Sequence, residues 1–183
     1  GRPTDEELMA QVAKSRRDAF ATLVRRHQRA LLNYFRKMGA HMDEAEDLVQ
    51  ETFLRLFGCR RTYRPSAAFV TFLYTLARHA WVDGVRKRRR RPEVELRTPD
   101  EPAVSGDDPE RRDPQPDLRE ALWSLSEKLR SVVVLSVCQG LKCREVAEVL
   151  GVPVGTVKSR RFLALKALRE ALDVERTVAG GEE

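Results

Sequence analysis

The chain has 183 residues, of which 42% are hydrophobic and 34% charged, which allows one or two small domains with real hydrophobic cores. Its 34 basic and 28 acidic residues give a formal net charge of +6, which favours a polyanionic partner such as nucleic acid. The sequence has no apolar run long enough for a membrane-spanning helix and no apolar signal-peptide core near its start, so we expect a cytoplasmic protein.

The first 38 residues predict two helices. Asp5 and Glu6 suit the first turn of the first helix, because the helix dipole favours negative charge there. The apolar pattern breaks at 15–19, and a longer amphipathic helix follows until Gly39. His27 lies on the buried stripe of this second helix. We interpret it as a half-buried residue, because no other ligand-type side chain is spaced to join it in a metal site.

The next predicted helix, over 43–57, has two different faces. One face is apolar and is expected to join the core. The other is acidic with one exposed leucine, and it consists of Asp47, Gln50, Glu51 and Leu54. In a chain that is otherwise so basic, this acidic face suggests a protein partner rather than DNA. A solvated helix surface is the alternative interpretation.

Residues 59–68 predict a loop, and a strongly apolar helix follows over 67–91. This helix ends in six consecutive cations, 86–91, which repel one another and are best explained by a phosphate backbone to neutralise. Aromatic residues upstream add the stacking surfaces that a single-strand binder needs. Tyr63, Tyr74 and Trp81 are the candidates for stacking on bases, with burial in the core as the alternative.

Residues 92–117 differ sharply in composition from the segments around them. They contain six prolines and nine acidic residues against three arginines, so this segment carries −6 and the rest of the chain +12. Such a segment cannot bury enough apolar surface to fold alone, which predicts a flexible acidic linker. Its negative charge should keep it away from duplex DNA and would suit a basic channel in a partner.

The last third predicts a second helical domain that contains a helix-turn-helix over 143–160. Ala147, Gly151 and Val157 have the spacing at which a small residue, a turn glycine and an apolar anchor close two short helices on each other. The second helix then carries basic and hydroxyl side chains on its outer face, as expected of a helix that enters a major groove. An ordinary helical hairpin with a solvated basic face is the alternative.

The three cysteines, Cys59, Cys138 and Cys143, are an odd number, which argues against a disulfide framework. No second pair or nearby histidine completes a zinc site with them. We therefore expect no metal and no cofactor, and interpret the cysteines as packing residues with a redox role left open.

Two helical domains, an acidic linker and a terminal helix-turn-helix, in this order, resemble the extracytoplasmic-function (ECF) sigma factors of bacterial RNA polymerase. The resemblance runs over nearly the whole chain, and four segments carry it: 18–20, 45–55, 69–78 and 155–160. It implies an all-α fold with a region-two domain at 1–91, a linker at 92–117, a region-four domain at 118–175 and a disordered tail at 176–183. Each segment alone is weak evidence for the family, but the four segments in this order are specific for it.

The resemblance also assigns roles to residues. The face formed by Asp47, Gln50, Glu51 and Leu54 matches the surface that binds the clamp helices of the polymerase β′ subunit. Recognition and melting of the minus-ten element fall to Tyr63, Arg64, Tyr74, Arg78, His79, Trp81, Arg86, Lys87, Arg88, Arg89 and Arg90. Recognition of the minus-thirty-five element falls to Thr156, Lys158, Ser159, Arg160, Arg161 and Phe162.

The chain departs from the family pattern at several positions. Phe72 stands where tryptophan is usual, His79 where asparagine is common, and Leu163 where an arginine often contacts DNA. The promoter sequence therefore does not transfer from the family.

The resemblance implies a monomeric sigma factor without catalytic activity, which binds core polymerase through β′ and the β flap, opens promoter DNA, and is restrained by an anti-sigma factor. The sequence also lacks a nucleophile–base pair and a glycine-rich phosphate loop, which argues against an enzyme. A stand-alone helix-turn-helix regulator is the alternative function. The acidic face at 43–57 and the lack of a dimerisation helix count against it.

Overall fold

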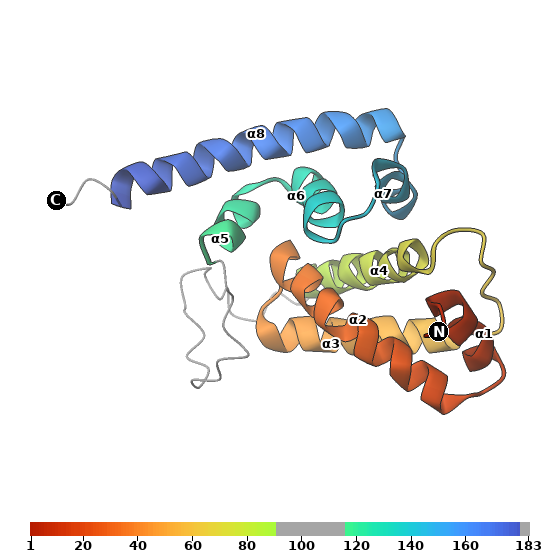
Figure 1. Ribbon diagram of the computed structural model, residues 1–183. Helices are drawn as coiled ribbons and strands as arrows, with labels where there is room; N and C mark the ends of the chain where they lie inside the picture. Colours follow the sequence, from red (N-terminus) through yellow and green to blue (C-terminus); the bar gives the residue numbers. More distant parts are fainter. Residues whose placement is uncertain (91–115, 180–183) are drawn as a thin grey trace.

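The computed structural model describes residues 1–90 and 116–179, with side chains described at 1–90 and 118–173. Within these ranges all regular elements are helical, which confirms the predicted all-α fold (Figure 1). Most of the predicted linker, 92–117, lies outside the described residues, as does Arg91. The predicted tail, 176–183, lies partly in the last helix and partly outside the described residues. No described helix is both long and apolar enough to cross a membrane.

Four helices form the amino-terminal group: α1 (Asp5–Ala13), α2 (Arg17–Met38), α3 (Met42–Gly58) and α4 (Phe69–Arg89). Helix α1 begins with a capping box, in which the Thr4 hydroxyl accepts from the Glu7 amide and the Glu7 carboxylate accepts from the Thr4 amide. Helix α2 ends at Gly39, whose φ of 119° suits a residue without Cβ.

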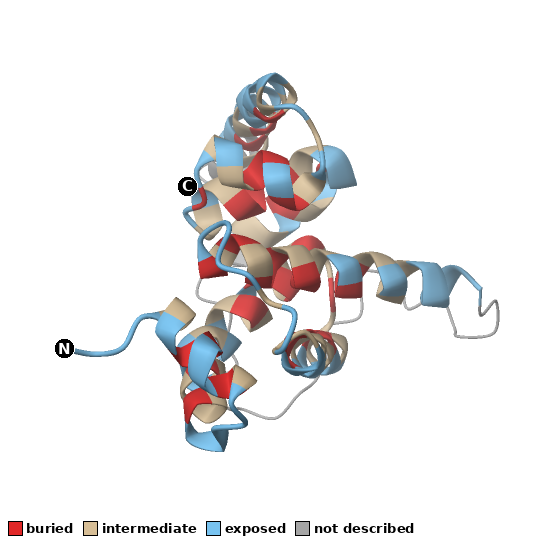
Figure 2. Ribbon diagram, turned by 90° about the vertical axis from the view of Figure 1, so that its right-hand side faces the viewer, coloured by how far each residue is buried: buried red, intermediate tan, exposed pale blue. Residues whose placement is uncertain are grey.

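The core of this group lies where α2 contacts α1 and α3, and where α3 contacts α4. Its largest buried side chains include Tyr34, Phe35 and Phe69. Several aromatic rings meet edge to face, among them Tyr34 and Phe35 with centroids 5.1 Å apart. Figure 2 shows buried residues gathered between the helices and exposed residues on the outer surfaces.

The carboxy-terminal group contains α5 (Pro116–Ser124), α6 (Glu127–Val133), the π-helical turn η2 (Val134–Cys138), α7 (Cys143–Leu150) and α8 (Val154–Ala179). Helix α8 is long and packs along α5, α6 and α7 (Figure 1). Helix α5 begins at Pro116, inside the stretch that the sequence assigned to the linker.

The two groups contact each other. Helix α4 packs against α7, and α2 packs against α5, α6 and η2, so the carboxy-terminal group lies over α2 and α4 (Figure 1). This contact determines which of the predicted site residues face solvent.

Candidate nucleic-acid interface

The predicted helix-turn-helix is present as α7 and α8. Val157 is fully buried and Ala147 is nearly so, which places the small residue and the apolar anchor between the two helices. Gly151 ends α7 with φ 65°, a left-handed conformation that glycine adopts without strain. The Pro153 carbonyl accepts from the amides of Thr156 and Val157 and so starts α8. The predicted spacing is therefore realised in three dimensions.

The first turns of α8 carry an exposed face with mixed chemistry. Lys158, Ser159 and Arg161 are exposed, and Thr156 and Arg160 are half-buried. The Ser159 hydroxyl donates to the Gly155 carbonyl (2.8 Å), so its oxygen still has acceptor capacity. Cationic, hydroxyl and apolar groups near the start of one helix can contact phosphates and base edges in a major groove.

Two large apolar side chains complete this face. Phe162 is 70% exposed and Leu163 is 52% exposed, which is unusual for residues of this size. An exposed apolar side chain on a helix that enters a major groove can contact the thymine methyl group. Leu163 was not among the predicted site residues, and its exposure adds it to this surface.

The acidic face of α3 is also on the surface. Asp47 and Gln50 are exposed, and Leu54 is 67% exposed. Glu51 is half-buried, and its carboxylate accepts from Arg55 Nε at 2.8 Å. Arg55 also donates to Asp83 of α4 (2.9 Å) and so joins the two helices. The predicted face is therefore continuous along α3, with Glu51 held by an internal ion pair.

The predicted minus-ten residues do not form one exposed surface. Arg64 and His79 are exposed, and Tyr63 and Arg78 are half-buried. In contrast, Tyr74 is 3% exposed and Trp81 is 4% exposed. The stacking candidates thus divide into one that is partly accessible, Tyr63, and two that are buried.

Tyr74 is covered by the carboxy-terminal group. Its hydroxyl donates to Gln139 Oε1 at 2.7 Å, and its ring meets that of Tyr34 at 5.3 Å. Burial raises the pKa of Tyr74, so the phenol remains protonated and keeps its hydrogen to donate.

The basic end of α4 is exposed at Arg86, Lys87, Arg88, Arg89 and Arg90. The Arg88 guanidinium is already engaged. It forms a bidentate ion pair with the Glu44 carboxylate of α3, with Nε–Oε1 at 3.1 Å and Nη1–Oε2 at 3.2 Å. Its guanidinium also lies 5.3 Å from the Trp81 ring centre. A phosphate that binds Arg88 must therefore compete with Glu44.

Three residues of the carboxy-terminal group that the sequence did not single out reach the amino-terminal group. Besides Gln139, Trp123 Nε1 donates to the Arg36 carbonyl (3.2 Å), and Arg130 Nη1 donates to the Met38 carbonyl (2.7 Å). Arg130 also donates to the Leu122, Trp123 and Leu125 carbonyls. Composition and periodicity carry no signal for these long-range bonds.

The described residues contain no group of three or more histidine, cysteine, aspartate or glutamate side chains that could hold a metal ion. His27 is half-buried as predicted, and its Nε2 lies 2.7 Å from Asp5 Oδ2. Cys59, Cys138 and Cys143 are free thiols and half-buried. Burial raises the pKa of Cys138, which disfavours the reactive thiolate.

Comparison with known proteins places this geometry in a family. Residues 23–91 match the family model Sigma-70 region 2, and residues 116–168 match Sigma-70, region 4. The chain is 31% identical to the RNA polymerase sigma-H factor of Pseudomonas aeruginosa, over 92% of this chain and 93% of that protein. It is also 31% identical to the ECF RNA polymerase sigma factor RpoE of Cereibacter sphaeroides, over 91% and 94% of the two chains.

Two solved structures have the same fold. The sigma factor RpoE of Bartonella quintana, in complex with the anti-sigma factor NepR, gives a TM-score of 0.72 at 25% identity, over 85% of this chain and 97% of that one. CnrH, in complex with the cytosolic domain of CnrY, gives 0.70 at 26% identity, over 93% and 97%. With both family models matched in the expected order and relatives that align along nearly their whole length, this chain belongs to the ECF sigma factors of bacterial RNA polymerase.

Proposed function

We propose that this chain binds core RNA polymerase and directs it to recognise and open promoter DNA. The observation that carries the proposal is the presence, in one ECF sigma-factor chain, of a region-two domain with an exposed acidic face on α3 and a region-four domain with an exposed reading face on α8. A sigma factor needs both surfaces, because it must contact polymerase and DNA at once.

In this proposal α3 binds the clamp helices of the β′ subunit through Asp47, Gln50, Glu51 and Leu54. The exposure of Leu54 between acidic neighbours supports this role, because an apolar anchor inside a charged rim is typical of protein interfaces. The carboxy-terminal group would contact the β flap.

Minus-thirty-five recognition is assigned to the first turns of α8. Lys158 and Arg161 supply cationic donors, Ser159 supplies a hydroxyl, and Phe162 supplies an apolar surface, all of them exposed. Thr156 and Arg160 flank this face and are assigned to the DNA backbone.

Minus-ten recognition is assigned to the loop after α3 and to α4, with Tyr63 and Arg64 on the loop and Arg78, His79 and the basic end on the helix. Tyr74 and Trp81 would take part only after a rearrangement, because both are buried in this structure. Arg86, Lys87, Arg89 and Arg90 would hold phosphates beside the opened strand.

We further propose that the protein has no catalytic activity of its own, acts as a monomer in the cytoplasm and is restrained by an anti-sigma factor. The complex of the related Bartonella quintana sigma factor with NepR supports the last point.

The test is co-elution of the full chain with bacterial core polymerase at moderate salt, followed by abortive transcription from a randomised promoter pool. We expect co-elution and selective initiation. Leu54→Asp should abolish co-elution, whereas Lys158→Ala should co-elute normally and lose promoter selection. A chain that binds duplex DNA but never polymerase would be a stand-alone regulator instead.

A further inference from the structure

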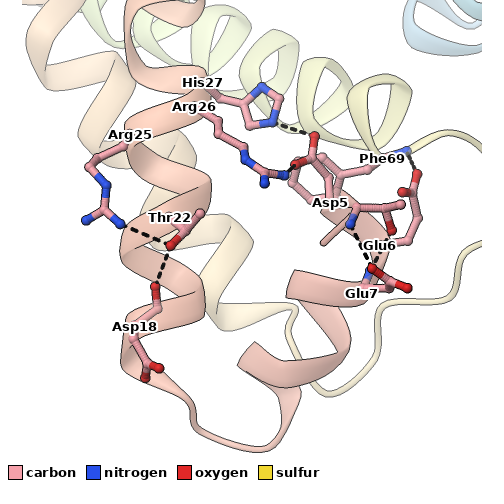
Figure 3. Close-up of polar contacts among 10 residues, drawn as sticks. Asp5, Glu6, Glu7, Asp18, Thr22, Arg25, Arg26, His27 and Phe69 are labelled. Carbon is pink, nitrogen blue, oxygen red and sulfur yellow. Dashed lines mark hydrogen bonds and ion pairs between the residues drawn. The ribbon is translucent and has the colours of Figure 1, made fainter. Parts of the chain in front are cut away.

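The start of helix α4 is capped by a residue far away in the sequence. Ala68, at the N-cap position of α4, provides no side-chain cap. The Phe69 amide instead donates to Glu6 Oε1 of α1 at 2.9 Å, across 63 residues of chain (Figure 3). The first amides of a helix have no partner within the helix, and a carboxylate also complements the positive end of the helix dipole. Glu6 supplies both.

Helix α1 is itself fixed in place for this contact. Asp5 Oδ1 accepts from Arg26 Nη1 and Asp5 Oδ2 lies against His27 Nε2, both at 2.7 Å, so one carboxylate ties α1 to α2 (Figure 3). The His27 ring in turn packs against the Phe69 ring, with centroids 5.4 Å apart. Asp5 and Glu6 therefore hold the same point, the start of α4, from two directions.

The loop that ends at this point carries Tyr63 and Arg64. The Tyr63 ring packs on Phe72 and Phe69, with centroid distances of 5.0 and 6.3 Å, and its amide donates to the Cys59 carbonyl. Burial raises the pKa of Tyr63, and the negative charges of Glu6 and Asp5 raise it further. The loop is thus anchored to the end of α3 at one side and to α1 and α4 at the other.

We propose that Glu6, supported by Asp5, is a positioning residue for the minus-ten loop. Its carboxylate fixes the position at which the loop enters α4, and through Phe69 it sets where the Tyr63 ring and the Arg64 guanidinium stand relative to the DNA strand. This inference rests on the proposed function of the loop. It extends the minus-ten site to α1, a helix for which the sequence pattern predicted no role in DNA recognition.

Two conservative substitutions separate the reach of Glu6 from its charge. Glu6→Asp keeps the charge but is one methylene too short to bond the Phe69 amide, whereas Glu6→Gln keeps the length and a carbonyl oxygen that can accept. Both suit the first turn of α1, so both should fold. Gln11→Ala, exposed on the same helix, is the control.

The experiment uses holoenzyme made from the full chain and core polymerase. It measures binding of a single-stranded minus-ten oligonucleotide of the sequence selected from the promoter pool, against oligonucleotides with one base changed at each position. We expect Glu6→Asp to lower discrimination at one position by about tenfold, which lies within the range expected for the loss of one base contact. Glu6→Gln and Gln11→Ala should stay near the wild-type ratio.

Core polymerase affinity and binding to a minus-thirty-five duplex should be unchanged in all three variants. Equal discrimination in Glu6→Asp and the wild type would overturn the positioning role, as would a loss spread equally over minus-ten, minus-thirty-five and polymerase binding, because that is general destabilisation. If the wild-type holoenzyme itself discriminated at no minus-ten position, that result would refute the proposed function of the loop, and with it the positioning role of Glu6.

Discussion

The two helices assigned to DNA differ in how they meet solvent. Helix α8 presents Lys158, Ser159, Arg161 and Phe162 on an open face, whereas α4 has its central residues Tyr74 and Trp81 buried. Tyr74 is held by a hydrogen bond to Gln139 of the other group. Helix α8 can therefore bind a DNA duplex without a change in this conformation. Stacking of a base on Tyr74, in contrast, requires the two helical groups to separate.

Hydrogen bonds cross the contact between the two groups at both α4 and α2. Among the described residues, hydrogen bonds between the groups join Tyr74 to Gln139, Trp123 to the Arg36 carbonyl and Arg130 to the Met38 carbonyl. Each contributes about 0.5–1.5 kcal/mol, and bonds to a charged donor contribute more. A partner that binds the separated groups can offset energies of this size.

The largest effect is expected from Arg130→Met. The substitution removes a guanidinium that donates to four carbonyls, of Met38, Leu122, Trp123 and Leu125. Because these carbonyls lose a charged donor, and the Leu122 carbonyl keeps only the Leu125 amide, the free energy of unfolding should fall by about 3 kcal/mol. Urea denaturation measures this. Arg144→Met, exposed on α7, is the matched control, and a loss no larger than in that control would refute the role of Arg130.

Lys158→Ala tests the exposed face of α8. If Lys158 contacts a base edge, the variant should lose about 1–3 kcal/mol on the selected minus-thirty-five duplex and less on random DNA. Fluorescence anisotropy with both duplexes measures the difference. Lys166→Ala, exposed further along α8, is the control. An equal loss on both duplexes would make Lys158 a phosphate contact.

Tyr74→Phe and Gln139→Ala test the covered side, since each removes the same hydrogen bond from a different group. Each should weaken the closed contact by about 1 kcal/mol. A weaker contact makes the open form more populated, so the free protein should bind the minus-ten single strand about fivefold more tightly. Both variants keep an aromatic ring at position 74 on which a base can stack. Anisotropy titration without polymerase measures this. If Gln139→Ala leaves the affinity unchanged, the bond does not restrict access to α4.

The smallest effect concerns the basic end of α4. Arg89→Ala should reduce the slope of log K against log salt by about 0.7 for a single strand, because one phosphate contact is lost. Arg88→Ala should change the slope less, since Glu44 already pairs with Arg88. Binding isotherms at several salt concentrations give both slopes. Equal slopes for the two variants would show that Glu44 does not compete with phosphate.

The sequence predicted those features that depend on neighbours along the chain. The helices follow from apolar periodicity, and the turn at Gly151 follows from the residue that accepts a left-handed conformation. The exposure of Leu54 and the half-burial of His27 were also predicted correctly, because both follow from the position of a residue around its own helix.

The features that the sequence did not predict are contacts between distant segments. Residue type made Tyr74 and Trp81 candidates for base stacking, with burial in the core as the alternative. What packs over α4 decides between the two, and both residues are buried. The Glu6–Phe69 bond and the Arg88–Glu44 pair join residues 63 and 44 positions apart, and no local pattern carries them. The acidic start of α1 was explained by its own helix dipole, although Glu6 serves the start of α4.

The distance between the two groups in solution shows most directly whether they separate on polymerase. Dyes placed through unnatural amino acids at Gln28 of α2 and Glu170 of α8, both exposed, report that distance by energy transfer. We expect high transfer in the free protein, no change when the minus-thirty-five duplex binds, and a fall when core polymerase binds. Unchanged transfer on polymerase, or an equal fall with the duplex alone, would contradict this expectation.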